Sequence, residues 1–174
     1  MKDDKKDSVY RRLVQTSVTN FIYCGDDWLF VKRNPNKRID PNRLNGTGGR
    51  LEEGETYVEA AIRETKEETG FVVTEDDVKL SGVVKLIGGY AEDWVMCFFR
   101  IKVPEKIILK NAEPDNGELI WINKDEVLST HHELVDDLNY CFKEIVEGKQ
   151  LFFLTAILND EQKIVKISKN LIDY

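Results

Sequence analysis

The sequence predicts a single mixed α/β domain, and three observations support this fold class. The chain has 174 residues, which is a usual length for one domain. Hydrophobic residues make up 41% of it and aromatic residues 10%, as in proteins that bury a core. Segments typical of strands are separated by two segments of helical spacing, which favours helices packed on a sheet. Residues 1–8 are polar and are expected to be a disordered tail ahead of one domain over residues 9–174.

The first expected elements are two strands joined by a tight turn. Residues 13–23 mix Val, Phe, Ile and Tyr with Thr and Ser, which favours a strand. Gly25-Asp26-Asp27 suits a turn, and residues 28–32 are again strand formers, so residues 13–33 predict a β-hairpin. Residues 34–45 contain two prolines and several charges and predict an exposed loop.

The clearest helix is expected from Thr56 to Thr69. Thr56 suits the N-cap position, and Glu59 three residues later completes a capping box. Residues 60–62 are apolar and give the helix a buried side, while Gly70 suits a left-handed C-cap.

The rest of the chain predicts more strands and one more helix. Runs rich in apolar residues predict strands over residues 78–87, 94–103, 119–122, 151–158 and 164–167. Gly88-Gly89 between the first two of these strands suggests a second hairpin. Residues 134–146 have apolar residues at helical spacing and predict the second helix.

Charge and cysteine content exclude several classes of protein. The 32 acidic and 25 basic residues give a net charge of −7, which argues against binding a nucleic-acid polymer. The three cysteines are widely spaced and are expected to be reduced core thiols. No signal peptide is apparent, and the longest apolar run, residues 151–158, is too short to cross a membrane. A soluble cytoplasmic protein is therefore expected.

Three carboxylates are expected on one face of the first helix. Glu64, Glu67 and Glu68 stand at positions i, i+3 and i+4, within about one helical turn. Carboxylates this close repel one another, and a hard cation such as Mg²⁺ would convert that repulsion into a binding site. For such a triplet alone, a solvated helix face is the commoner interpretation. Residues 49–71 hold seven acids and three bases, so more than half of the net charge of −7 lies in this segment.

The wider pattern decides between these interpretations. Residues 49–71 resemble the Nudix box, G-x5-E-x7-R-E-U-x-E-E-x-G-U, in which U is apolar. The matching residues are Gly49, Glu55, Arg63, Glu64, Glu67, Glu68, Gly70 and Phe71. The single departure is Thr65, at a position that is usually apolar and that should face the core. A local change in packing, and no loss of activity, is expected there.

The resemblance implies a fold, an activity and a metal. Nudix proteins are α/β/α sandwiches with a mixed β-sheet. They hydrolyse nucleoside diphosphates that are linked to another moiety. By position, Glu64, Glu67 and Glu68 would bind Mg²⁺ or Mn²⁺ together with the carbonyl of Gly49. Glu68 is our choice for the residue that orients or deprotonates the attacking water. Arg63 would hold a carboxylate in place through a charge-assisted hydrogen bond.

The segment before the box bears on the substrate. Residues 45–50 resemble the Asn-Gly-x-Gly-Gly-Lys sequence of MutT-like diphosphatases that act on oxidised purine nucleoside triphosphates. By this resemblance Asn45 would contact the purine, with Gly48 and Arg50 close to the substrate. Asn45 could equally serve only to support a turn. Arg33 matches a basic position near the substrate, although an ordinary surface arginine is the commoner interpretation.

A second stretch with MutT-like character is Gly117–Leu128. Many relatives carry a further metal-binding glutamate just before it, where this chain has Asn116. Glu118 and Glu113 are the candidates to replace that carboxylate. Further along, Asp136 and Asp137 match an acidic pair that contacts the purine in similar proteins, but they could equally be acids that favour a helix N-terminus.

The function expected from the resemblance is that of a MutT-like 8-oxo-dGTP diphosphatase. It would release a nucleoside monophosphate and pyrophosphate, with a small nucleotide as its ligand, and would act as a monomer or homodimer. One alternative is an ADP-ribose or nucleotide-sugar pyrophosphatase, but such relatives often carry a proline beyond the box and residues 72–103 have none. Another is a non-catalytic nucleotide-binding Nudix module, although the box carboxylates that such modules tend to lose are all present.

Overall fold

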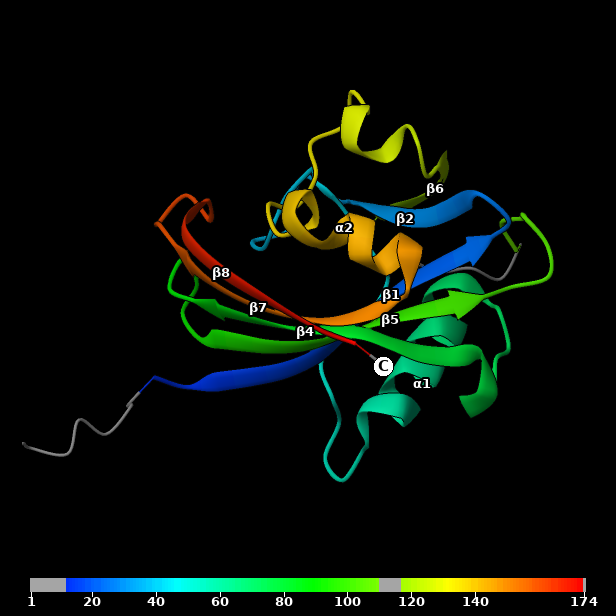
Figure 1. The fold of residues 1–174 in the computed structure, drawn as a ribbon, viewed down its shortest axis with the longest axis horizontal. Helices are drawn as coiled ribbons and strands as arrows, with labels where there is room; N and C mark the ends of the chain where they lie inside the picture. The colour runs from blue at the N-terminus through cyan, green and yellow to red at the C-terminus, as the bar shows by residue number, and fades with distance from the viewer. Residues whose placement is uncertain (1–11, 110–116, 174) are drawn as a thin grey trace, which may run out of the picture.

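The protein is a three-layer α/β/α sandwich, as the sequence predicts (Figure 1). The computed structural model describes residues 12–109 and 117–173, so the tail expected over residues 1–8 lies outside the described part. The helices are α1 (Tyr57–Thr69) and α2 (Leu138–Glu147), with short 3-10 turns η1 (Glu75–Asp77) and η2 (Val127–Ser129). The strands are β1 (Val14–Cys24), β2 (Asp27–Arg33), β3 (Leu44–Asn45), β4 (Val78–Ile87), β5 (Asp93–Lys102), β6 (Gly117–Asn123), β7 (Gln150–Leu158) and β8 (Ile164–Asp173).

These strands form one mixed sheet. They follow the order β3-β2-β1-β5-β4-β7-β8, and β6 pairs with β2 outside this path. The pairs β1–β5 and β4–β7 are parallel, while the pairs β1–β2, β4–β5 and β7–β8 are antiparallel. Both predicted hairpins are present, since β1 turns into β2 and β4 turns into β5. The parallel pairs require longer crossovers, and α1 and α2 lie in those crossovers.

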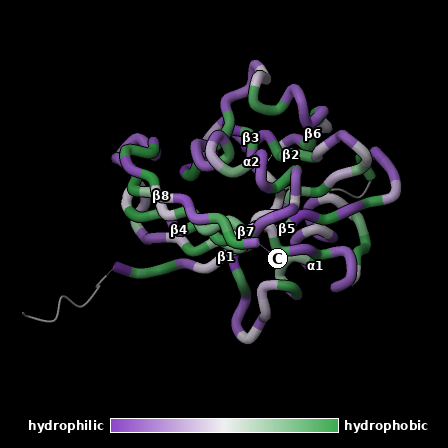
Figure 2. Tube along the Cα trace, in the orientation of Figure 1, coloured by the Kyte–Doolittle hydropathy of each residue, from purple (hydrophilic) through white to green (hydrophobic). Residues whose placement is uncertain are grey.

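Each face of the sheet packs against one helix, which gives the domain two cores. Phe21 of β1 belongs to the core beneath α2, whereas its neighbour Ile22 belongs to the core beneath α1. This split arises because successive side chains of a strand point to opposite faces. Ala60 and Ala61 bring α1 close to the sheet, and both are fully buried. Figure 2 shows hydrophobic stretches along the strands and hydrophilic stretches in many of the peripheral loops.

The first helix has the ends that the sequence predicts. The amide of Glu59 donates to Oγ1 of Thr56 over 3.2 Å, and the Thr56 amide donates to Oε2 of Glu59 over 2.8 Å, which forms the capping box. Gly70 is the C-cap, and its amide donates to the carbonyl of Lys66. Because these signals are local, they determine the residues at which α1 begins and ends, independently of the remaining fold.

Three parts of the fold differ from the prediction because tertiary pairing decides them. The second helix begins at Leu138 and not at residue 134, since residues 133–135 run beside β3 and exchange backbone hydrogen bonds with Leu44. Leu44 and its neighbour also form β3 in a segment expected to be a loop. Strand β8 continues to Asp173 and pairs with β7 throughout, but its side chains are mostly exposed, so it lacks an alternating apolar pattern.

The cysteines and the lengths of the helices relate to two further expectations. The three cysteines are free, and Cys141 is buried in the α2 core. No helix in residues 12–109 and 117–173 is long and apolar enough to span a membrane.

Candidate active site

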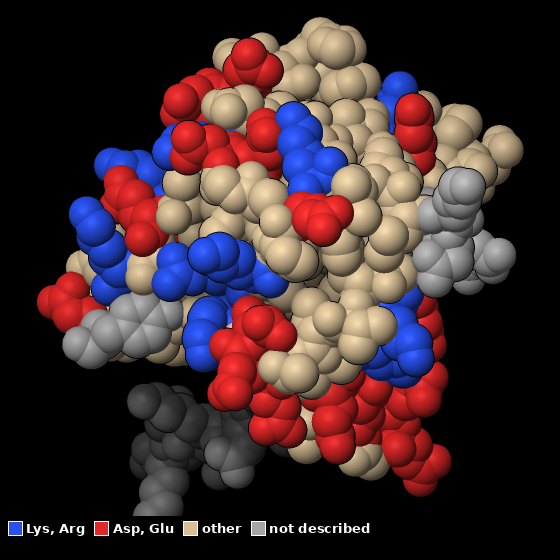
Figure 3. Space-filling view, turned by 90° about the vertical axis from the view of Figure 1, so that its right-hand side faces the viewer, with Lys and Arg blue, Asp and Glu red and all other residues tan. Residues whose placement is uncertain are grey.

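Helix α1 presents three glutamates that differ in exposure. Glu68 is buried, with 5% of its surface exposed, and the Glu64 side chain is 12% exposed. The Glu67 side chain is 58% exposed. Figure 3 shows acidic side chains gathered at the lower edge of one face of the molecule, the level at which α1 lies in Figure 1. The spacing of these three glutamates therefore places one carboxylate at the surface and two against the body of the domain.

Arg63 ties the helix to the loop that precedes it. Its Nε and Nη2 atoms donate to the two oxygens of Glu55 over 2.7 and 2.9 Å, which is a bidentate contact. Its Nη1 atom donates to Oε1 of Glu64 over 2.8 Å and to Oε2 of Glu67 over 3.1 Å. Nη2 also donates to the carbonyl of Arg50 over 3.2 Å. One guanidinium thus fixes the loop and two of the three helix carboxylates.

The charges of this cluster shift two carboxylate pKa values in opposite directions. The hydrogen bonds from Arg63 lower the pKa of Glu55. Burial raises the pKa of Glu64, and the neighbouring Arg63 offsets only part of that effect. Glu64 is therefore a carboxylate whose ionised form would be stabilised by a further positive charge.

The glycines before the helix let the loop approach both β1 and the glutamates. Gly48 has φ of +138°, and a Cβ there would lie 2.3 Å from the carbonyl oxygen of Val18. A Cβ on Gly49 would lie 2.3 Å from Oε1 of Glu64. The Gly48 amide donates to Oε2 of Glu68 over 2.8 Å, and the Gly49 carbonyl accepts from the Val18 amide over 2.9 Å. This segment needs glycine because neighbouring atoms occupy the space of a side chain.

Thr65, the departure from the box pattern, has a polar partner inside the core. Thr65 is fully buried, and its Oγ1 accepts a hydrogen bond over 3.1 Å from Nδ2 of Asn20 on β1. Nδ2 of Asn20 also donates to the carbonyl of Ala61 over 2.9 Å. The position faces the core, as expected, but the contact is polar. The sequence did not predict a role for Asn20, which is one of several polar residues in a strand that mixes polar and apolar side chains.

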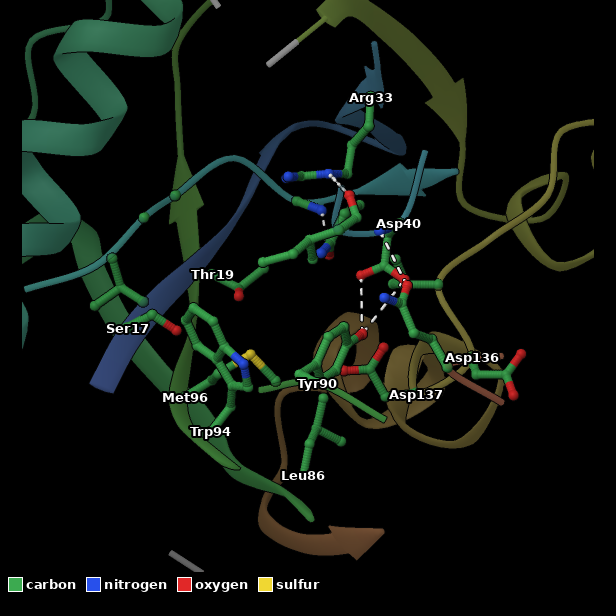
Figure 4. A pocket seen from close by; sticks show the side chains of 18 of the residues that line it. Ser17, Thr19, Arg33, Asp40, Leu86, Tyr90, Trp94, Met96, Asp136 and Asp137 are labelled. Carbon is green, nitrogen blue, oxygen red and sulfur yellow. Dashed lines mark hydrogen bonds between the residues drawn. The ribbon is translucent and has the colours of Figure 1, made fainter. Parts of the chain in front are cut away.

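A cavity of about 300 Å³ lies next to the glycine loop (Figure 4). Its wall includes seven residues that the sequence singled out: Arg33, Asn45, Gly48, Gly49, Arg50, Asp136 and Asp137. The loop residues Gly48 and Gly49 also contact the glutamates of α1, so they join the cavity to the carboxylates. The fold thus brings together residues from both ends of the domain.

One side of the cavity is formed by two carboxyl groups and a tyrosine, grouped together in Figure 4. Asp137 is buried, and burial, reinforced by the charge of Asp40, raises its pKa to about 7. Asp40 accepts hydrogen bonds from the hydroxyl of Tyr90 over 3.2 Å and from Nη1 of Arg43 over 3.0 Å. Burial also raises the pKa of Tyr90 above its usual value, which keeps its hydroxyl protonated as a donor. The sequence did not single out Asp40 or Tyr90.

The two neighbouring aspartates have different environments. Asp137 is at the N-cap position of α2 and makes no side-chain capping bond. Asp136 points away from Tyr90 and Asp137 in Figure 4. Its Oδ2 accepts from the Ile164 amide over 2.8 Å, and its Oδ1 lies 3.5 Å from Nζ of Lys163. Of the pair, Asp137 is therefore the one whose carboxyl group is grouped with Asp40 and Tyr90.

The other residues of the cavity wall that were predicted to contact substrate also interact with other groups of the protein. Oδ1 of Asn45 accepts from the Gly46 amide over 2.8 Å, so this residue supports the turn as well as lining the cavity. Nε of Arg33 donates to the carbonyl of Ile39 over 2.9 Å. The Arg50 guanidinium lies over the Trp94 ring, 5.1 Å from its centre, in a cation–π contact.

Glu118, one of the proposed replacement carboxylates, is not part of this cavity. Glu118 lies on β6 opposite Lys32 and lines a separate hollow with Lys32 and Pro35. Glu113 and Asn116 lie outside the described residues. Within the described part of the chain, no three acidic, histidine or cysteine side chains are grouped closely enough to hold a metal ion as they stand.

Known proteins resemble this chain in both sequence pattern and fold. The mutator MutT protein from Bacillus halodurans matches 90% of this chain and 97% of its own, with 22% identity and a TM-score of 0.75. A bifunctional NMN adenylyltransferase/ADP-ribose pyrophosphatase from Francisella tularensis, solved with AMP and a Mn ion, is 19% identical; the match covers 79% of this chain and 42% of that one, with a TM-score of 0.63.

A third solved structure is the NUDIX domain of NrtR from Shewanella oneidensis with ADP-ribose. It is 15% identical and has a TM-score of 0.61, and the match covers 84% of this chain and 94% of that one. At such identities the solved structures establish a shared fold. The model of the NUDIX domain matches residues 14–143, which is more than half of the chain, and the protein therefore belongs to the Nudix family.

Proposed function

We propose that this Nudix protein hydrolyses a nucleoside triphosphate, with an oxidised purine such as 8-oxo-dGTP as its substrate. The observation that carries the proposal is the position of the cavity. Its wall combines Asn45 and the buried Asp137 with the glycine loop, and the loop contacts Glu64 and Glu68. A base held at one end would thus have its phosphates directed toward the carboxylates.

The polar groups of the cavity suit a purine. An amide such as Asn45 offers both a donor and an acceptor. With a pKa of about 7, Asp137 can carry a proton near neutral pH and then also offers both. The adjacent Asp40 accepts from Tyr90 and Arg43 and offers negative charge beside the base. A guanine-type edge, which presents several donors and an acceptor, would match this set.

The carboxylates of α1 fit a divalent cation by their chemistry. Mg²⁺ and Mn²⁺ bind carboxylate and carbonyl oxygens, and Glu64, Glu67, Glu68 and the Gly49 carbonyl supply such atoms. Burial disfavours the ionised form of Glu64, and a bound cation would stabilise it. Arg63 already donates to Glu64 and Glu67, so a cation would compete with it for these oxygens. We assign these four groups as the ligands of Mg²⁺, with Mn²⁺ as a substitute.

The remaining residues would hold and orient the reactants. When bound, the cation supplies neutralisation of phosphate charge and activation of water. Glu68, whose Oε2 is oriented by the Gly48 amide, would accept the proton of the attacking water. Arg50, steadied over Trp94 at the cavity wall, would contact the phosphates. Attack on a phosphorus of the triphosphate would release the monophosphate and pyrophosphate.

A substrate panel tests this proposal. The purified protein is assayed with oxidised dGTP, dGTP, ADP-ribose and dinucleoside polyphosphates, each with Mg²⁺ and with Mn²⁺. We expect the highest kcat/KM with oxidised dGTP, and a loss of about 100-fold or more in kcat for Glu67→Gln and Glu68→Gln. Glu53→Gln is the matched control, because this exposed glutamate precedes the helix and lies outside the assigned ligands. Unchanged turnover in the Glu67 and Glu68 variants would reject the metal-site assignment.

The similar structures favour one second candidate. Two of the compared proteins are described with ADP-ribose, one as its pyrophosphatase and one as a complex with it. An ADP-ribose pyrophosphatase would show its highest kcat/KM with ADP-ribose in the same panel. A non-catalytic nucleotide-binding module would bind a nucleotide of the panel in the presence of Mg²⁺, as measured by calorimetry, and would leave every nucleotide intact.

A further inference from the structure

Asn20 on β1 contacts both parts of the candidate active site. It is fully buried, and its backbone exchanges two hydrogen bonds with Thr47 of the glycine loop, over 2.6 and 3.1 Å. Its side chain donates to Thr65 and to the carbonyl of Ala61 on α1, over 3.1 and 2.9 Å. The residue therefore fixes the loop with its backbone and the helix with its side chain.

Together with short stretches of the chain itself, these hydrogen bonds form a closed ring. From Asn20 the ring passes through Thr47 to Gly48, whose amide donates to Oε2 of Glu68 over 2.8 Å. From Glu68 it returns along one turn of α1 to Thr65, and from Thr65 to Asn20. Thr47 and Thr65 are fully buried and Glu68 is 5% exposed. Buried hydrogen bonds cannot be replaced by water without cost, so this ring restrains the distance between loop and helix.

We propose that Asn20 and Thr65 form a positioning pair, which restrains the glycine loop and α1 relative to each other and so limits the movement that the glutamates need to bind a divalent cation. This inference rests on the proposed function, because it concerns the same metal ligands. A hydrophobic residue at position 65 would pack against β1 but would not fix its direction or depth. The polar pair adds directional contacts. Residues that orient metal ligands without contacting the metal commonly change metal affinity by about 10–100-fold when they are removed.

The pair makes a prediction that simple packing does not make. Thr65→Val keeps the shape of the side chain and removes the acceptor for Nδ2 of Asn20. Thr65→Ser keeps the acceptor and loses only a methyl group. If the hydrogen bond positions the ligands, Thr65→Val should weaken metal binding and Thr65→Ser should not, although Thr65→Ser leaves the larger gap in the core.

The primary experiment measures Mn²⁺ binding without nucleotide, by electron paramagnetic resonance of the free ion. For Thr65→Val and Asn20→Leu we expect Kd for Mn²⁺ to rise about tenfold, and for Thr65→Ser to stay within about twofold. The double variant that combines Asn20→Leu with Thr65→Val should bind Mn²⁺ as weakly as Asn20→Leu alone, because Asn20→Leu already removes the hydrogen bond between the two residues. In the assay kcat should fall about tenfold, with KM for the nucleotide nearly unchanged.

Thr69→Val is the matched control on the same helix. Thr69 is 1% exposed, and its hydroxyl donates to the carbonyl of Thr65 without reaching β1 or the loop. It should affect the free energy of unfolding and leave Mn²⁺ affinity within about twofold. If Asn20→Leu fails to fold, Thr65→Val and Thr65→Ser still decide the question.

Three outcomes are distinguishable. Thr65→Val that folds and binds Mn²⁺ like the unmodified protein overturns the positioning pair and leaves the proposed function intact. The positioning pair is also overturned if Thr65→Ser and Thr69→Val weaken Mn²⁺ binding as much as Thr65→Val does, since packing alone would then explain the effect. An unmodified protein whose Mn²⁺ binding is absent, or insensitive to Glu67→Gln, overturns the metal site itself.

Discussion

Replacing Asp137 by asparagine should make the stability of the protein much less dependent on pH. The buried carboxyl group of Asp137 has a pKa raised to about 7, first by burial and then by the charge of Asp40. In the unfolded chain its pKa should be near the ordinary value of 3.8. Between these values the folded state keeps a proton that the unfolded state releases, so rising pH favours unfolding. The Asp137→Asn variant has no proton to lose at this position.

The size of the effect follows from the two pKa values. The shift from 3.8 to about 7 is roughly three units, and at 1.36 kcal/mol per unit it corresponds to about 4 kcal/mol well above pH 7. Below pH 3.8 both states are protonated and the cost vanishes. Between pH 5 and pH 8 the unmodified protein should therefore lose about 2.5 kcal/mol of stability through this group alone, as an upper estimate.

Urea unfolding of both proteins between pH 5 and pH 8 measures this difference. The free energy of unfolding of Asp137→Asn minus that of the unmodified protein should rise by about 2.5 kcal/mol across this range. The subtraction removes the contributions of groups that do not interact with Asp137, such as Glu64, whose pKa burial also raises.

Asp136→Asn is the matched control for this experiment. Asp136 is the adjacent residue, but its carboxylate accepts from the Ile164 amide and points away from Tyr90 and Asp137 (Figure 4). Its difference from the unmodified protein should rise much less between pH 5 and pH 8, because the charge of Asp136 contributes less than burial and Asp40 to the raised pKa of Asp137. A flat difference for Asp137→Asn, or an equal rise for both variants, would refute the argument that burial holds a proton on Asp137.

Four further variants test the loop, the helix cluster and the cavity. In Gly49→Ala the new Cβ would meet Oε1 of Glu64, a flexible side-chain end, so Mn²⁺ affinity should fall about tenfold while thermal unfolding changes little. In Gly48→Ala the Cβ would meet the backbone of Val18 at a φ of +138°, so urea unfolding should show a loss of about 2 kcal/mol or more. Arg63→Lys keeps the charge but cannot form the bidentate contact with Glu55, and should cost about 1–3 kcal/mol in the same measurement. Asn45→Ala should raise KM for oxidised dGTP about tenfold, and an equal rise for ADP-ribose would argue against contact with the purine.

The order of the elements was predictable because its signals are local. The capping box at Thr56, the glycine after Thr69 and the alternation of the strands each depend on only a few neighbouring residues. The errors occurred where distant segments decide. The predicted helix began at residue 134, but residues 133–135 instead pair with Leu44, and β8 is extended because β7 supplies its hydrogen bonds. A single sequence carries no direct signal for either pairing.

Sequence alone placed Glu64, Glu67 and Glu68 together on one helix and indicated the family, which the match to the NUDIX domain confirms. The metal-binding role of these glutamates stays a prediction. Only the tertiary structure decided that Asn20 meets Thr65, that Asp40 and Tyr90 stand beside Asp137, and that Glu118 lies in a separate hollow. The physical reason is that spacing along a helix is local, whereas burial, the loss of solvation and the pKa of about 7 at Asp137 depend on segments far apart in the chain.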